Sequence, residues 1–311
     1  MTPFCAAVDW GTSSFRLWLL SGDGSALAER RSDEGMIRAA ATGFEAILER
    51  HLGELGVAAD LPVIVCGMAG ARQGWREAGY LDTPANLADI IRNTMTVDGT
   101  ARDVRILPGI AQRDASAPDV MRGEETQLLG LVADGFGSAL VCMPGTHSKW
   151  VTLDAGKVAG FSTYMTGELF DVISRHSILS AAMGGASEVL ADDPAFLDAA
   201  TSAFDSPAML SNLLFQLRAG QLLGFTPPAE GAPRLSGTLI GLELAGAMAR
   251  HGPVGEVVLV ASGGLGALYR GILESRGLTV QVRDANEAVR RGLWSAAREF
   301  WGTKGAETHG R

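Results

Sequence analysis

The sequence predicts an α/β protein of two domains, each a βββαβα unit, which face each other across a cleft. Three observations predict this fold class. The chain has 311 residues, a length typical of about two domains. Short apolar runs of strand length alternate with segments of helical periodicity. An opening of strand, loop, strand and turn occurs twice, which indicates an internal duplication.

The first third of the chain predicts strands followed by alternating helix and strand. Two apolar runs, 4–8 and 15–20, flank the loop Asp-Trp-Gly-Thr-Ser-Ser, and a glycine-containing turn follows at 21–24. Apolar residues at helical spacing predict a helix over 44–55. The next expected elements are a strand over 62–67, a helix over 87–95 and a strand over 104–107.

The opening recurs from residue 138, with an apolar strand over 138–143, the loop Pro-Gly-Thr-His-Ser, a strand over 149–153 and a turn. At an offset of 134 positions five residues coincide: Gly11, Thr12, Ser14, Leu19 and Gly22 match Gly145, Thr146, Ser148, Leu153 and Gly156. We therefore expect domains over 1–115 and 116–311. An amphipathic helix after the expected N-cap Asn286 ends the chain, and it is expected to pack against a domain, the N-terminal one being a candidate.

Composition excludes several classes of protein. The net charge is −9 without a basic block, which disfavours a nucleic-acid partner. No apolar stretch has the roughly 18–20 residues that span a bilayer, and the start lacks the order of a signal peptide, so no membrane is expected and the location is read as cytoplasmic. The three cysteines are odd in number and lie in apolar runs, which favours buried thiols.

Three glycine-rich loops could hold a phosphate chain. Small residues let backbone N–H groups approach oxygen atoms, and hydroxyls add donors. The first two loops are the duplicated pair, for which ordinary hairpin turns are the alternative. The third follows the apolar strand 257–261, before a helix expected from Ala267. The third loop also imitates a dinucleotide fingerprint, with Gly264 and Gly266 followed by Asp284, but Tyr269 stands where a small residue is needed.

Five segments carry a resemblance to a known family: Val8–Ser13, Gly67–Trp75, Val120–Gly130, Pro144–Trp150 and Met165–Phe170. In these segments the sequence resembles the 2-dehydro-3-deoxygalactonokinases of the sugar-kinase and actin superfamily, and the resemblance covers most of the chain. The resemblance implies an actin-like, ribonuclease-H-like fold. It also implies ATP- and Mg²⁺-dependent phosphorylation of 2-dehydro-3-deoxy-D-galactonate to its 6-phosphate in galactonate catabolism.

The resemblance assigns the nucleotide and metal residues. Asp9 is the expected Mg²⁺ ligand, because the second loop has Met143 and Pro144 where the superfamily has an acidic loop. The expected cofactor-binding residues are Gly11, Thr12, Ser13, Gly145, Thr146, Ser148, Lys149, Ser262, Gly263 and Gly264. Lys149 would neutralise phosphate charge, although a lysine that opens a surface strand is the alternative.

A carboxylate near the acceptor hydroxyl is the remaining catalytic need. Glu124 is favoured as the base, with Glu125 as its neighbour and Asp171 as a rival. The alternative is that Glu124 and Glu125 are helix N-terminal carboxylates favoured by the macrodipole.

The substrate carries a carboxylate, for which a guanidinium is the expected partner. Arg72 is the leading candidate, beside Gln73 and Trp75, and Arg16 and Arg122 are the alternatives. Thr166, Gly167 and Glu168 are expected to complete the sugar pocket. His147 is expected to brace its loop.

Other functions compete with this one. They are a phosphatase like the exopolyphosphatases of the same superfamily, a kinase for a related keto-deoxy sugar acid, a sugar-sensing regulator and a dinucleotide-dependent oxidoreductase. The sequence leaves open the preferred epimer, galacto or gluco, and whether the chain forms a homo-oligomer.

Overall fold

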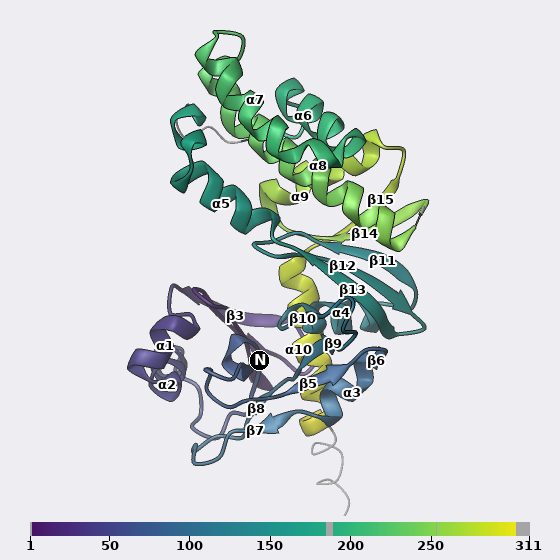
Figure 1. The fold of residues 1–311 in the computed structure, drawn as a ribbon. Helices are drawn as coiled ribbons and strands as arrows, with labels where there is room; N and C mark the ends of the chain where they lie inside the picture. Colours follow the sequence, from purple (N-terminus) through teal and green to yellow (C-terminus); the bar gives the residue numbers. More distant parts are fainter. Residues whose placement is uncertain (1, 185–188, 253, 303–311) are drawn as a thin grey trace, which may run out of the picture. The chain divides into compact units, whose positions relative to one another are not determined.

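The computed structural model describes residues 2–184, 189–252 and 254–302, and the chain divides into two compact units. Unit 1 consists of Met1–Ser138, Leu153–Gly160 and Ala285–Arg311, and unit 2 of Ala139–Thr152 and Phe161–Asp284. Each unit combines sheet and helix (Figure 1), as the α/β class requires. The domain boundary that the sequence predicts after residue 115 stays a prediction.

The main sheet of unit 1 has the strand order β3-β2-β1-β4-β8-β7. Its strands are β1 (Cys5–Trp10), β2 (Phe15–Leu20), β3 (Ala26–Ser32), β4 (Val63–Gly67), β7 (Met95–Thr96) and β8 (Val104–Ile106). β1 pairs antiparallel with β2 and parallel with β4, which in turn pairs parallel with β8. β4 is buried at every residue and β1 at all but Asp9. Strands buried on both faces need continuous apolar runs, which is why the sequence marks them so clearly.

The remaining elements of unit 1 are one small sheet and several helices. The small sheet has the order β10-β9-β5, and β6 pairs antiparallel with the later segment at Lys157 and Val158. These strands are β5 (Tyr80–Asp82), β6 (Ala85–Asn86), β9 (Gly109–Gln112) and β10 (Asp119–Met121). The helices are α1 (Met36–Thr42), α2 (Phe44–Glu54), η1 (Met68–Gly70), α3 (Leu87–Arg92), α4 (Glu124–Ala133) and α10 (Ala285–Trp301).

Unit 2 repeats the strand order of unit 1. Its strands, some of which extend into the Leu153–Gly160 segment of unit 1, are β11 (Ala139–Met143), β12 (Ser148–Asp154), β13 (Lys157–Tyr164), β14 (Glu256–Val260) and β15 (Thr279–Arg283). They lie in the order β15-β14-β11-β12-β13. In both units the first strand therefore has the second and third strands on one side and two strands in parallel pairing on the other. This shared order confirms the predicted duplication.

The helices of unit 2 follow β13 and flank the last two strands. They are α5 (Thr166–His176), η2 (Ile178–Ala182), α6 (Pro194–Asp205), η3 (Pro207–Met209), α7 (Leu210–Leu222), η4 (Pro228–Glu230), α8 (Gly231–His251) and α9 (Gly263–Ser275). α8 packs along α6, and the apolar core of the unit joins side chains from these two helices, α9 and strands β11, β12 and β14.

Three predicted boundaries are wrong. The helix expected over 87–95 ends at Arg92, because β7 begins at Met95. The helix expected from Ala267 begins at Gly263, so the glycines form its first turn. Asn286 is not an N-cap, since α10 already begins at Ala285 and the Asn286 side chain accepts a hydrogen bond from the Arg16 guanidinium.

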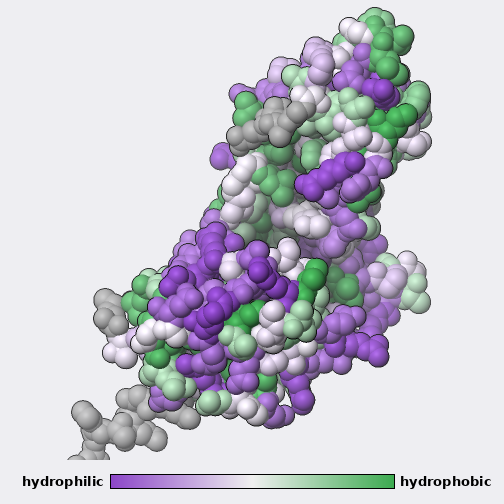
Figure 2. Space-filling model, turned by 90° about the vertical axis from the view of Figure 1, so that its left-hand side faces the viewer, coloured by the Kyte–Doolittle hydropathy of each residue, from purple (hydrophilic) through white to green (hydrophobic). Residues whose placement is uncertain are grey.

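Hydrophilic and hydrophobic residues alternate over the face of the molecule that Figure 2 shows. Exposed apolar side chains include Leu222, Leu223 and Phe225 at and after the end of α7. Of the helices in the described part of the chain, none combines the length and apolar character needed to cross a bilayer. The three cysteines are free and buried in β1, β4 and β11, as predicted.

Glycines let pairs of helices approach closely in both units. A methyl group on Gly292 of α10 would collide with the Thr126 carbonyl oxygen of α4, and one on Gly130 of α4 with the Ala288 carbonyl oxygen of α10. In unit 2, Gly237 and Gly241 of α8 face backbone carbonyls of α6 in the same way. These contacts fix the helices that carry Glu124 and Glu243.

Replacing Gly292 with alanine should lower the free energy of unfolding by about 1–3 kcal/mol, because overpacking displaces α10 from α4. Gly53 in α2 is the matched control, since a methyl group there meets nothing within 4 Å. Its replacement by alanine should raise the free energy of unfolding by up to about 1 kcal/mol. Urea denaturation measures both. Equal stabilities for the Gly292→Ala variant and the unmodified protein would contradict the close packing.

Candidate functional site

Asp9 lies near the carboxyl end of β1, where unit 1 brings three chain segments together. It pairs across the sheet with Arg16 of β2 and Cys66 of β4, and the Cys66 thiol donates to Asp9 Oδ1 at 3.8 Å. Gly67 and Gly123 adjoin it, because a Cβ on Gly67 would lie 3.5 Å from Asp9 Oδ1 and a Cβ on Gly123 would lie 3.7 Å from the Gly67 Cα. Burial raises the pKa of Asp9, with Glu124 adding to the rise and Arg16 opposing it.

The first glycine loop follows Asp9 and is held by helix α1. Gly11 O accepts from Met36 N at 2.9 Å and Thr12 O accepts from Ile37 N at 3.1 Å, so the loop carbonyls cap the start of α1. Only glycine fits at position 35, because a Cβ there would lie 2.5 Å from the backbone of Ser13. The side chains of Thr12 and Ser13 are exposed. The loop is therefore fixed through its carbonyls and presents its hydroxyls to solvent.

Glu124 and Glu125 begin α4, at the junction that the sequence predicts. Glu124 Oε2 accepts from the backbone N–H of Arg122 at 3.2 Å, and Glu125 Oε2 accepts from that of Gly123 at 2.6 Å. Thr126 Oγ1 donates to Glu125 Oε1 at 3.0 Å. Glu125 has no exposed surface, whereas Glu124 is partly exposed. Burial, with a contribution from Glu124, raises the pKa of Glu125 to about 8, and Arg122 opposes the shift.

The loop after η1 carries the predicted sugar residues. Arg72 and Gln73 are exposed, as residues that bind a ligand from solvent would be. Trp75 is partly buried, and its ring stacks on Phe44 at 6.0 Å and meets Trp10 edge-on at 6.0 Å. Its indole therefore packs against the core of unit 1, a placement that the sequence did not indicate.

Arg122 occupies a different environment from Arg72. Its guanidinium lies 4.4 Å from the centre of the Tyr80 ring, and Nη2 donates to the Gly79 carbonyl oxygen at 2.7 Å. Its Nε and Nη1 are buried without a hydrogen-bond partner in the structure. Nη1 lies so close to Gly70 that a side chain at position 70 would collide with it. Arg122 thus contacts Gly79 and Tyr80 and partly offsets the rise in the pKa of Glu125.

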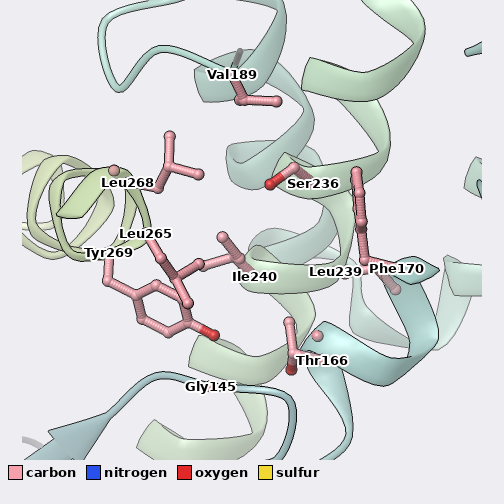
Figure 3. Close-up of a pocket in the computed structure, with 12 residues that line it drawn as sticks. Gly145, Thr166, Phe170, Val189, Ser236, Leu239, Ile240, Leu265, Leu268 and Tyr269 are labelled. Atoms are coloured by element: carbon pink, nitrogen blue, oxygen red, sulfur yellow. The ribbon is translucent and has the colours of Figure 1, made fainter. Parts of the chain in front are cut away.

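Unit 2 contains a cavity of about 280 Å³ with a mainly apolar lining (Figure 3). Four of its lining residues are predicted site residues, namely Gly145, Thr166, Gly167 and Gly264. The others are Phe170, Val189, Ser236, Leu239, Ile240, Leu265, Leu268 and Tyr269. The second and third glycine loops and the start of α5 therefore border one cavity.

The second glycine loop is held by α5 as the first is held by α1. Glu168 N donates to Thr146 O at 3.0 Å, and a Cβ on Gly167 would lie 2.6 Å from Gly145 O. Thr12 and Thr146, which correspond at the offset of 134, thus both cap a helix through their carbonyl oxygens. The two units therefore share the way in which a helix holds the glycine loop, as well as the order of their strands.

A buried carboxylate that the sequence analysis missed lies beneath the cavity. Glu243 of α8 is 1 % exposed. Its Oε1 accepts from Trp150 Nε1 at 2.8 Å, and its Oε2 accepts from Tyr269 Oη at 2.5 Å and from Thr166 Oγ1. Burial raises its pKa, and these donors oppose the shift. A sequence signal existed, since Glu243 is the one charged residue between 235 and 249.

The remaining predicted residues of unit 2 lie in several environments. Ser148 is buried and its hydroxyl lies 3.0 Å from Tyr269 Oη, so Ser148, like Thr166, faces the Glu243 cluster. The Lys149 side chain is buried, and its Nζ donates to His147 O at 3.3 Å. His147 pairs with Glu168.

The last predicted site residues to be placed are those of the third glycine loop and Asp171. Ser262 Oγ donates to Asp284 Oδ2 at 2.7 Å, and Gly263, with a φ of +70°, begins α9. Asp171 lies on α5, half-exposed, and pairs with Arg175 at 2.9 Å. That pair is a surface ion pair of adjacent helical turns, which contributes little to stability.

The pKa of Glu125 gives a testable pH dependence. Because the folded protein holds a proton on Glu125 up to about pH 8, and the ordinary value is 4.5, stability falls as pH rises through this window, by at most about 1.4 kcal/mol per pH unit. The Glu125→Gln variant has no proton to lose, so its stability relative to the unmodified protein should increase from pH 5 to pH 8.

Urea denaturation at pH 5, 6, 7 and 8 measures this difference. The exposed Glu45 of α2 provides the matched control as Glu45→Gln. If the stability of Glu125→Gln ran parallel to that of the unmodified protein over the whole range, Glu125 would be ionised in the fold and the account of its burial would be wrong.

Comparison with known proteins agrees with the geometry. Residues 9–296 match a family model described as 2-keto-3-deoxy-galactonokinase. A relative described as a probable 2-dehydro-3-deoxygalactonokinase of Rhizobium meliloti (strain 1021) is 60 % identical over 299 residues, covering 96 % of this chain and 98 % of the relative. A 2-dehydro-3-deoxygalactonokinase of Escherichia coli (strain K12) is 34 % identical over 297 residues, with the same coverage of both chains.

A solved structure is also similar over nearly the whole chain. It is a crystal structure from Sinorhizobium meliloti, of a protein described as a candidate 2-dehydro-3-deoxygalactonokinase. It is 60 % identical, covers 96 % of this chain and 99 % of its own, and superimposes with a TM-score of 0.93. The likeness extends over both units.

Proposed function

The chain belongs to the 2-keto-3-deoxy-galactonokinase family, and from that premise we propose that it transfers the γ-phosphoryl group of ATP to the terminal hydroxyl of 2-dehydro-3-deoxy-D-galactonate. The product is the 6-phosphate. The observation that carries this function is the family match over residues 9–296, which includes both units. The match favours the kinase over the phosphatase, regulator and oxidoreductase alternatives.

The cavity of unit 2 is proposed as the nucleotide site. Its apolar side chains suit an adenine ring, because planar ligands are held mainly by apolar surface with a few polar groups. Gly145 and Gly264 border it, and Gly264 belongs to the first turn of α9, where free backbone N–H groups favour phosphate oxygens. The glycines admit the phosphates closely because they have no side chains.

Asp9 is the residue proposed to hold a magnesium ion. Mg²⁺ keeps several waters and binds through one or two carboxylates together with substrate phosphates. The described residues contain no group of three or more acidic, histidine or cysteine side chains that could enclose a metal. The ion would neutralise phosphate charge, and it would relieve the repulsion by which Glu124 raises the pKa of Asp9.

Glu124 is proposed as the base for the acceptor hydroxyl. It is partly exposed, whereas Glu125 is fully buried and its oxygens are occupied by Gly123 N–H and the Thr126 hydroxyl. Glu124 would accept the proton of the acceptor hydroxyl. The hydroxyl oxygen forms a bond to the γ-phosphorus of ATP, and the bond between the γ-phosphorus and the bridging β-phosphate oxygen breaks. Glu125 then acts as a neutral neighbour that leaves Glu124 as the charged member of the pair.

Arg72 is proposed to bind the carboxylate of the sugar acid. Its side chain is exposed. In Arg122, by contrast, two guanidinium nitrogens are buried and the third donates a hydrogen bond to the Gly79 carbonyl oxygen. Gln73 would bond substrate hydroxyls from the same loop. The cytoplasmic location is part of this proposal, since ATP and free thiols are found together there.

Glu124→Gln and Asp9→Asn should each lower kcat by about 100-fold or more, because one removes the proton acceptor and the other the metal ligand. A coupled assay with ATP and the keto-acid measures kcat. Asp171→Asn tests the rival base and should leave kcat within about twofold of the unmodified enzyme, as should Glu274→Gln in an exposed ion pair on α9. An unchanged kcat for Glu124→Gln would move the base elsewhere, and a large loss for Asp171→Asn would place it on α5.

Arg72→Ala should raise the KM for the keto-acid roughly 10- to 100-fold, since a charged hydrogen-bonded pair to the substrate is lost. The KM for ATP should not change. Arg76→Ala is the matched control, because Arg76 lies in the same segment and pairs only weakly with Asp98, at 3.7 Å. If both variants kept the KM of the unmodified enzyme for the acid, Arg72 would not be the carboxylate partner.

A further inference from the structure

We infer that Glu243 is a positioning residue of the nucleotide site, which holds the start of α5 and the first turns of α9 in place through hydrogen bonds from Thr166 and Tyr269. This inference rests on the proposed nucleotide site in unit 2. Glu243 does not line the cavity itself, so it would act through the two side chains that do.

The hydrogen bonds of Glu243 join α5, α9 and β12 to α8. Thr166 begins α5, Tyr269 lies in α9, Trp150 in β12 and Glu243 in α8. Tyr269 Oη also lies 3.0 Å from Ser148 Oγ, at the end of the second glycine loop. Figure 3 shows Thr166 and Tyr269 on the same side of the cavity, near Gly145. One carboxylate therefore connects two of the cavity walls with a phosphate loop.

The link from Thr166 continues to the phosphate loop through the backbone. The two residues after Thr166 contact that loop directly, since Glu168 N donates to Thr146 O at 3.0 Å and Gly167 has room only for hydrogen against Gly145 O. A shift of Thr166 would therefore move the loop that is proposed to hold phosphate. Displacements of about 1 Å in such a site are enough to lower catalysis strongly.

Burial explains why this carboxylate is sensitive to its partners. A buried carboxylate without donors is strongly disfavoured, and removing one partner leaves the other group unpaired. An apolar residue would fill the same space without the hydrogen bonds. A glutamate at position 243 is thus suited to orienting hydroxyl and indole donors rather than to filling the core.

Thr166→Val provides the sharpest test, because it removes the bond between Glu243 and α5 while keeping the shape of the side chain. The matched control is Thr152→Val, which removes another hydroxyl of unit 2, bonded to His251 Nδ1 at 3.1 Å and outside the cavity. Titration calorimetry with ATP and Mg²⁺ and steady-state kinetics against both substrates measure the effect. We expect Thr166→Val to raise the Kd and KM for ATP about tenfold, and Thr152→Val to change neither.

Two substitutions of Glu243 separate positioning from folding. Glu243→Gln keeps an acceptor for Trp150 and an amide that can donate to the two hydroxyl oxygens, so it should bind ATP within about threefold of the unmodified protein. Glu243→Leu should weaken ATP binding at least as much as Thr166→Val; if it fails to fold, Thr166→Val carries the test.

The outcomes distinguish this inference from the function on which it rests. Unchanged ATP binding by Thr166→Val, in a preparation whose unmodified protein binds ATP, would overturn the role of Glu243 and leave the kinase function intact. Equal weakening by Thr166→Val and Thr152→Val would also overturn it, because the effect would then be one of general stability. An absence of ATP binding by the unmodified protein would overturn the nucleotide site and the inference together.

Discussion

Each unit of this protein contains a buried glutamate carboxyl group that needs hydrogen-bond donors, and this requirement constrains the elements around it. Unit 1 buries Glu125 at the start of α4, and unit 2 buries Glu243 in the middle of α8. Each receives donors from residues of the predicted site region, Gly123 and Thr126 in one unit and Thr166, Tyr269 and Trp150 in the other. Because a buried polar group without hydrogen-bond partners is strongly disfavoured, movement of the donors away from the carboxyl group is opposed. The two clusters therefore give rigidity to the loops and helix ends that are proposed to bind substrate.

The duplication explains why both units present a glycine loop in the same way. In each, the loop follows the central first strand, and the carbonyl oxygen of the loop threonine, Thr12 or Thr146, accepts a hydrogen bond from the start of a helix. In each, a glycine of that helix start, Gly35 or Gly167, allows the close approach. The copies have since diverged chemically. The first loop follows the carboxylate of Asp9, and the second follows Met143 and borders an apolar cavity, which suits one to metal and acceptor and the other to nucleotide.

The sequence could predict the elements that depend on local pattern. The strands β1, β2, β4 and β11 and the junction at Glu124 follow from apolar runs, glycines and helix periodicity, all of which are local. Side-chain direction was not predictable, because it depends on partners far along the chain. Thr166 meets Glu243 across 77 positions and Trp150 meets it across 93, so no spacing rule indicates that Thr166 and Ser148 face a buried carboxylate. Trp75 likewise packs on Phe44, a contact that no local pattern indicates, and its role toward a sugar stays a prediction. The roles of Asp9, Glu124 and Arg72 stay predictions, which their surroundings support.

Photolabelling with 8-azido-ATP, followed by mapping of the labelled peptides, tests the central claim most directly. That claim is that the cavity of unit 2 holds the nucleotide. The account predicts label in α5, α8 or α9, near Phe170, Ile240 or Leu265, which excess ATP with Mg²⁺ suppresses and the keto-acid alone does not. Label confined to other peptides, or label that ATP fails to displace, would contradict it.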